Sequence, residues 1–178
     1  MTTGRILNIP NILTLARIVL IPVFLLVAYW PPAMGIDETN TNMTRHLILT
    51  AIFVVAAVTD WFDGYLARTL NLTSAFGCFL DPVADKLMVA AALIVLVQWQ
   101  PTVSMAFAAI VIISREITVS ALREWMAELG ARTNVAVSTV GKYKTAFQMI
   151  AITVFLLNWP PLEILAYALL YTAVILTL

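Results

Sequence analysis

Six apolar segments constrain the fold of this chain more than any other feature. Five of them, with 17 to 23 residues, are close to the roughly 20 residues that a helix needs to cross a bilayer, and the first has 13. They cover residues 18–30, 47–68, 81–99, 103–125, 140–159 and 162–178. Hydrophobic residues make up 62% of the chain and charged residues 11%, whereas soluble domains carry about 25% charged residues. A soluble enzyme, a disordered chain and a nucleic-acid-binding protein are therefore excluded as first interpretations.

We predict an all-α integral membrane protein with six transmembrane helices in a single domain, 1–178. Residues 9–17 are mixed in character and are interpreted as an interfacial lead-in to the first span. A polar loop is expected over 31–46, and a turn over 69–76. The last span, 162–178, is short and has no basic anchor, which indicates a marginal or truncated helix.

Basic residues are sorted by side when the connections are assigned alternately to the two faces of the membrane. One side holds Arg5, Arg17, Arg68, Lys86, Arg115, Arg123, Arg132, Lys142 and Lys144. The other side holds only Arg45. Because cytoplasmic loops carry an excess of Lys and Arg, both termini are predicted to be cytoplasmic.

Four of the ten acidic residues gather in a 26-residue window, 60–85. Their spacing places Asp60 and Asp63 on one face of a helix, and Asp81 and Asp85 on one face of the next. Four carboxylates share a poorly solvated site only when cations neutralise them. Mg²⁺ is the natural partner, and two such ions would clamp a diphosphate. The spacing therefore predicts a metal site for a phosphate-containing ligand.

Neighbouring residues in this window support the same interpretation. Gly64 leaves room for a ligand beside the helix, and Arg68 offers paired donors to phosphate. Pro82 is expected in the first turn of the third helix, where proline is tolerated. The alternative is that the acids are interfacial charges paired with Arg68 and Lys86. Charged groups at a membrane are costly, which favours the functional interpretation.

The pattern D-x-x-D-G-x-x-A-R, eight residues, then G-x-x-x-D-x-x-x-D resembles the signature of the CDP-alcohol phosphotransferases. The lead-in 8–17 is similar to that of the family, and 114–148 resembles its bacterial members that use sn-glycerol 3-phosphate. The resemblance implies a six-helix, homodimeric enzyme of the bacterial inner membrane with a cytoplasmic active site. It also implies transfer from CDP-diacylglycerol to sn-glycerol 3-phosphate, giving phosphatidylglycerol phosphate and CMP.

The resemblance further implies residue roles. Two divalent ions, Mg²⁺ or alternatively Mn²⁺, would be held by Asp60, Asp63, Asp81 and Asp85. Asp85 would be the general base. The CDP-linked donor would be bound by Asp60, Gly64, Ala67, Arg68 and Gly77.

A group of basic residues independently points to an acceptor that carries a phosphate. The expected phosphate-binding residues are Arg115, Arg123 and Lys142. A cluster of cations suits a phosphate monoester and is not needed for a neutral alcohol. Arg132 and Lys144 are interpreted instead as anchors for anionic lipid head groups. Glu116 and Glu124 are adjacent to the arginines and are expected to orient them.

Three alternative functions remain open from the residues. Within the same family, the acceptor would be inositol phosphate, serine or a second phosphatidylglycerol. A membrane prenyltransferase also uses aspartates and Mg²⁺ on a diphosphate, although with different motifs. A divalent-cation transporter would need acids near the midplane on broken helices, whereas these acids fall at predicted span ends.

Overall fold

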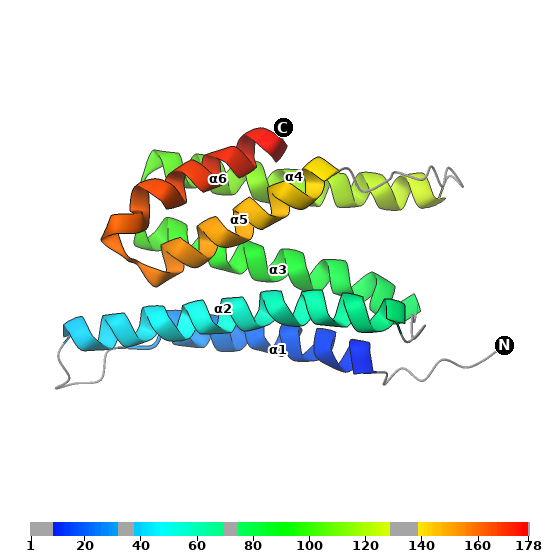
Figure 1. Cartoon of the computed structure of the whole chain (residues 1–178), viewed down its shortest axis with the longest axis horizontal. Helices are drawn as coiled ribbons and strands as arrows, with labels where there is room; N and C mark the ends of the chain where they lie inside the picture. Colours follow the sequence, from blue (N-terminus) through cyan, green and yellow to red (C-terminus); the bar gives the residue numbers. More distant parts are fainter. Residues whose placement is uncertain (1–8, 32–37, 70–74, 129–138, 178) are drawn as a thin grey trace. The chain divides into compact units, whose positions relative to one another are not determined.

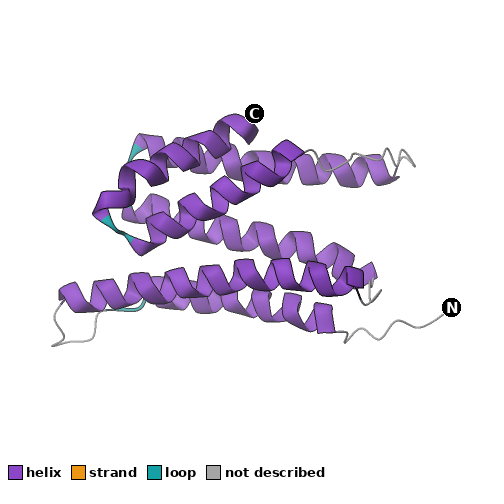
Figure 2. Cartoon of the chain, viewed as in Figure 1, coloured by secondary structure: helices purple, strands orange, loops and turns teal. Residues whose placement is uncertain are grey.

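The computed structural model describes residues 9–31, 38–69, 75–128 and 139–177 (Figure 1). Across these ranges the chain is helical apart from short connections, and no strand is found (Figure 2). The α-helices are α1 (Ile9–Ala28), α2 (Glu38–Thr69), α3 (Ala75–Trp99), α4 (Val103–Glu128), α5 (Thr139–Leu157) and α6 (Glu163–Thr177). The predicted all-α fold is confirmed for this part of the chain.

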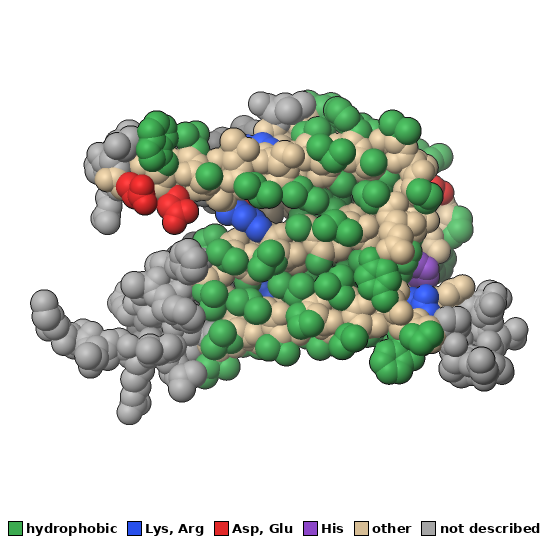
Figure 3. Space-filling model, turned by 180° about the vertical axis from the view of Figure 1, so that it is seen from behind, with side chains coloured by type: hydrophobic (Ala, Val, Ile, Leu, Met, Phe, Trp, Pro, Cys, Tyr) green, Lys and Arg blue, Asp and Glu red, His purple; other side chains and the backbone are tan. Residues whose placement is uncertain are grey.

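The helices present a surface that suits a bilayer. The segments long and apolar enough to span are Asn42–Asp60, Val103–Met126 and Pro160–Thr177, with shorter apolar ones at Ile12–Ala28 and Tyr143–Leu157. Large apolar side chains stay exposed along them, as with Ile110 at 63% and Ile164 at 86%. Apolar side chains are spread over the face of the molecule that Figure 3 shows. Soluble proteins rarely expose so much contiguous apolar surface. The chain is therefore a multi-pass membrane protein.

The chain divides into two compact units, Met1–Ala92 (the N-terminal unit) and Leu93–Leu178 (the C-terminal unit). In the N-terminal unit, α1 and α2 pack side by side and run antiparallel (Figure 1). Buried residues of α2 recur at helical spacing: Leu49, Phe53 and Ala56. Residues spaced by three and four share one helix face, so α2 has a defined interior side.

In the C-terminal unit, α6 packs against α5 and α4. The rings of Phe155 on α5 and Tyr167 on α6 meet edge to face, with centroids 4.9 Å apart and planes at 82°. The Tyr171 hydroxyl donates to the Ser104 carbonyl at 3.2 Å and ties α6 to α4. Edge-to-face pairing is favourable beyond simple burial, so it helps to fix this helix packing.

Two boundaries expected from the sequence are wrong. The predicted loop 31–46 is helical from Glu38, because a polar helix end that extends into water has no hydropathy signal. Arg45 on this extension donates to the Trp30 carbonyl at 2.7 Å. Pro82 lies inside α3 and not in its first turn, because α3 begins earlier, at Ala75. Lacking an N–H, Pro82 leaves one helical carbonyl without its usual donor.

Candidate active site

The buried face of α1 changes from apolar to polar along the helix. Phe24 and Ala28 are buried near its C-terminal end, and Thr14 and Arg17 are buried nearer its start. Arg17 is only 1% exposed although it carries a full charge. Because Thr14 and Arg17 are three residues apart, both side chains leave the same side of the helix. A buried charge requires partners, so α1 must meet acceptors at this point.

Hydrogen-bond acceptors for Thr14 and Arg17 lie on the interior sides of α2 and α3. Asp60 follows Ala56 by four residues and so continues the buried face of α2. On α3, Asp81 and Asp85 are spaced by four, beside buried Ala84 and Met88. Helical periodicity thus directs these carboxylates inward at one end of the N-terminal unit. We call Asp60, Asp81 and Asp85 the acidic cluster.

Arg17 and Thr14 tie the acidic cluster to α1. The Arg17 Nη1 atom donates to Asp60 Oδ1 at 3.0 Å and also to Asp85 Oδ1. The Thr14 hydroxyl donates to Asp81 Oδ1. The side chains of Asp60 and Asp85 are 42% and 41% exposed, so the cluster remains accessible. Among these described contacts, one guanidinium faces two of the three carboxylates, so the negative charge of these four side chains is in excess.

The predicted convergence of aspartates is found in part. Asp60 and Asp85 come together on a single arginine nitrogen, and Asp81 is tethered to the same helix, α1. Other predicted residues lie in α2 or α3 with side chains outside the described part of the structure: Asp63, Gly64, Ala67, Arg68 and Gly77. Their predicted roles therefore stay predictions.

Sequence reasoning missed Arg17 and Thr14 as members of this site. It placed Arg17 only among the basic residues of the cytoplasmic side. A usable signal existed, because an arginine within an apolar helix is costly and usually functional. Its spacing of three from Thr14 would have indicated a polar patch on the interior side of α1.

The donor set of the acidic cluster fits a hard divalent cation. Its side-chain donors are carboxylate oxygens, which Mg²⁺ and Mn²⁺ prefer over nitrogen or sulfur. Asp60 and Asp85 already converge on one positively charged group. The described side chains alone provide no group of three acidic, histidine or cysteine ligands, and Asp63 lies outside them. The predicted role of Asp63 as a metal ligand therefore stays a prediction.

A second set of charges, Arg115, Glu116 and Lys144, joins α4 to α5 in the C-terminal unit; we call it the charged cluster. Lys144 Nζ donates to Glu116 Oε1, and Arg115 Nη1 lies 3.9 Å from the same oxygen. Glu116 therefore lies beside Arg115, and the expectation that Glu116 and Glu124 orient the neighbouring arginines stays a prediction. The interpretation of Lys144 as a lipid anchor is wrong, because Lys144 is 3% exposed and ion-paired. The side chains of Arg123 and Lys142 lie outside the described residues, as does Arg132 altogether.

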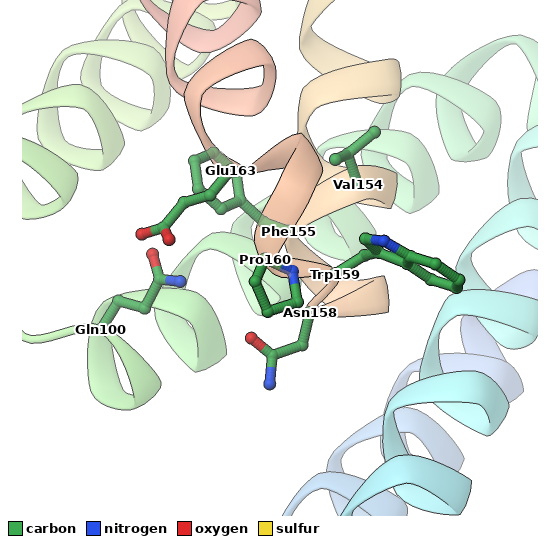
Figure 4. Close-up of a pocket in the computed structure, with 7 residues that line it drawn as sticks. All are labelled: Gln100, Val154, Phe155, Asn158, Trp159, Pro160 and Glu163. Carbon is green, nitrogen blue, oxygen red and sulfur yellow. The ribbon is translucent and has the colours of Figure 1, made fainter.

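A small pocket lies at the opposite end of α5, where the chain turns into α6 (Figure 4). Asn158 directly follows α5 and has a positive φ of 51°, and Pro160 begins a 3₁₀ turn. Figure 4 shows the polar ends of Gln100 and Glu163 directed toward the same space. Asn158 is 14 residues after Lys144, about 20 Å along the chain at 1.5 Å per residue. This pocket is therefore separate from the charged cluster.

Comparison with known proteins decides the family. The model of the CDP-alcohol phosphatidyltransferase family matches residues 7–178. The chain belongs to this family. Three relatives are each named CDP-diacylglycerol–glycerol-3-phosphate 3-phosphatidyltransferase. The Haemophilus influenzae protein is 51% identical over 96% of this chain and 88% of its own length. Those of Pectobacterium atrosepticum and Shigella flexneri serotype 5b are 49% and 47% identical, over 96% of this chain and 88% and 89% of their lengths.

Removing the Thr14 hydroxyl should lower the catalytic efficiency of this CDP-alcohol phosphatidyltransferase. Thr14→Val keeps the side-chain shape but removes the donor to Asp81. A hydrogen bond to a charged group contributes about 1.5–3 kcal/mol, so kcat/KM for the CDP-linked donor should fall about tenfold or more. Steady-state kinetics in detergent micelles measure this change in kcat/KM. Thr14→Ser keeps the hydroxyl and should stay within about threefold of wild type; equal rates for both variants would contradict the role.

Proposed function

We propose that this phosphatidyltransferase transfers the phosphatidyl group of CDP-diacylglycerol to sn-glycerol 3-phosphate, forming phosphatidylglycerol phosphate and releasing CMP. The observation that carries the proposal is the 47–51% identity, over 96% of the chain, to relatives named for this donor and acceptor. The charges of the chain support it. Clustered carboxylates suit a metal-bound diphosphate, and clustered cations suit a phosphate monoester.

In this proposal, residues of the signature motif hold the donor. The proposed contacts to the CDP group come from Asp60, Gly64, Ala67, Arg68 and Gly77. The proposed metal ligands are Asp60, Asp63, Asp81 and Asp85. Two Mg²⁺ ions bound there, or Mn²⁺ in their place, would offset the negative charge of the diphosphate. From α1, Arg17 holds Asp60 and Asp85 in place and Thr14 holds Asp81, so Arg17 and Thr14 are positioning residues.

The proposed reaction is an in-line displacement. The acceptor hydroxyl oxygen attacks the phosphorus that carries diacylglycerol, and the bond from this phosphorus to the CMP oxygen breaks. Asp85 takes the hydroxyl proton, a role that requires hydrogen-bond reach of that group. Arg68 donates to the leaving CMP phosphate. The proposed contacts to the acceptor phosphate come from Arg115, Arg123 and Lys142.

The proposed topology has all six helices spanning the bacterial inner membrane, with both termini and the active site on the cytoplasmic side. Nine of the ten basic residues fall on that side when the connections alternate. We also propose a homodimer, as in the family that the sequence resembles. Cysteine labelling from either side of the membrane and light scattering of the purified protein test these two proposals.

A direct test measures CMP release from CDP-diacylglycerol by the purified protein with Mg²⁺ and one acceptor at a time. Release with glycerol 3-phosphate, and its loss with EDTA, is expected. Radiolabelled glycerol 3-phosphate should appear in lipid, and unlabelled inositol phosphate or serine should not compete. A preference for inositol phosphate would instead support that member of the same family, and release without an acceptor would reject both.

Truncating Arg123 should impair use of the acceptor more than use of the donor. Arg123→Ala removes one of the cations proposed to bind the acceptor phosphate, so KM for glycerol 3-phosphate should rise about tenfold. KM for CDP-diacylglycerol should stay within about twofold. Arg45→Ala changes a basic residue on the opposite predicted side and should alter neither value. An unchanged KM for glycerol 3-phosphate would remove Arg123 from the acceptor site.

A further inference from the structure

A buried lysine near the start of α5 is unusual in a membrane helix. Lys144 is 3% exposed, and its ammonium group donates to Glu116 on α4. Both residues belong to the C-terminal unit. Burying an unpaired ammonium in such surroundings is costly, and the ion pair with Glu116 offsets part of this cost.

One carboxylate oxygen serves two cations in the charged cluster. Glu116 Oε1 accepts from Lys144 and also lies 3.9 Å from Arg115 Nη1. Two positive charges against one negative charge leave a net charge of +1 on these three side chains. Exposure is graded, with the side chains of Lys144, Glu116 and Arg115 at 4%, 27% and 36%. The excess positive charge is therefore accessible from the arginine side.

The polar character of α5 continues inward from Lys144. Gln148 lies one helical turn later on the same face and is 4% exposed. Within the described part of the protein, its Oε1 atom is buried and accepts no hydrogen bond. Further along this face, Ala151, Ile152 and Phe155 form an apolar core. A buried carbonyl without a donor is costly, so a donor from outside the described side chains is expected to reach it.

We propose that Glu116 is a positioning residue for the acceptor: its carboxylate holds Lys144 and Arg115 as a pre-oriented pair that binds the acceptor phosphate. This inference rests on the proposed function and adds Glu116 and Lys144 to it. A free lysine side chain loses rotamer entropy when a ligand fixes it. Glu116 fixes Lys144 before the ligand arrives, which is how pre-organisation raises affinity.

Neutralising Glu116 tests the inference. Glu116→Gln keeps the shape and a neutral acceptor for Lys144, but charge-assisted hydrogen bonds are about twice as strong as neutral ones. KM for glycerol 3-phosphate should rise about tenfold, with kcat and KM for CDP-diacylglycerol within about twofold of wild type. Inhibition by inorganic phosphate should weaken in parallel. Glu116→Asp should recover part of the loss, and Glu128→Gln, at the exposed end of α4, should change nothing.

A purely structural ion pair would give a different result. It would lower the unfolding temperature of Glu116→Gln and leave KM for glycerol 3-phosphate unchanged, which would overturn the inference. If Glu116→Gln does not accumulate, Glu116→Asp decides, because it keeps both cations and the negative charge but withdraws the carboxylate from Lys144 and Arg115. A raised KM for glycerol 3-phosphate in Glu116→Asp supports the inference, and a wild-type KM overturns it. If wild-type protein releases no CMP with glycerol 3-phosphate, the proposed function itself fails.

Discussion

Replacing Asp85 by asparagine should abolish CMP release while the protein still inserts in the membrane. Asparagine matches the size of Asp85 and can still accept a hydrogen bond from Arg17, so the packing of α1 and α3 should persist. It cannot take up the acceptor proton. General-base catalysis contributes about 10²–10⁴-fold, so kcat should fall at least a hundredfold. Release of labelled CMP from CDP-diacylglycerol measures the effect.

The same variant separates the two roles proposed for Asp85. If Asp85 contributed only to metal affinity, saturating Mg²⁺ would restore the activity of the variant. If Asp85 is the base, saturating Mg²⁺ does not restore activity. Activity that stays below 1% of wild type across a Mg²⁺ titration is the expected result. Recovery at high Mg²⁺ would reject the base assignment and leave Asp85 as a ligand alone. Glu163→Gln, the same kind of change at the exposed start of α6, serves as the control for loss of one negative charge.

The positions of the helices follow from the sequence because lipid imposes a length on each apolar segment. The third predicted span, 81–99, ends where α3 ends, at Trp99, and the fourth begins at the same residue as α4. The start of α2 does not follow in this way. Its first residues are polar, and a helix that extends into water is not distinguishable by hydropathy from a polar loop.

For the site, the sequence predicts relations within one helix but not contacts between residues of different helices. The spacing of Asp81 and Asp85 predicts a common face, because one helical turn fixes both side chains. Arg17 is separated by 43 residues from Asp60 and by 68 from Asp85, and no periodicity relates positions so far apart. Glu116 and Lys144 are likewise 28 residues apart. These contacts depend on how helices pack, which a single sequence does not encode in any local pattern.

Replacing Arg17 by glutamine should both destabilise the protein and inactivate it. The substitution leaves Asp60 and Asp85 without the guanidinium that they share. Breaking a buried ion pair costs about 3–5 kcal/mol, and the lower end applies here because both carboxylates are about 40% exposed. The unfolding temperature in detergent should therefore fall by several degrees. Arg45→Gln, at the other end of the α1–α2 pair, is the matched control and should have little effect.

Mg²⁺ should offset part of the stability lost in Arg17→Gln. With the guanidinium removed, repulsion between the carboxylates of Asp60 and Asp85 increases, and a divalent cation relieves it. A ligand that binds only the folded state stabilises it by about 2.7 kcal/mol at 100 times its Kd. The unfolding temperature of the variant should therefore rise with Mg²⁺ more steeply than that of wild type. No response to Mg²⁺ in either protein would contradict a metal site at these aspartates, whatever the activity.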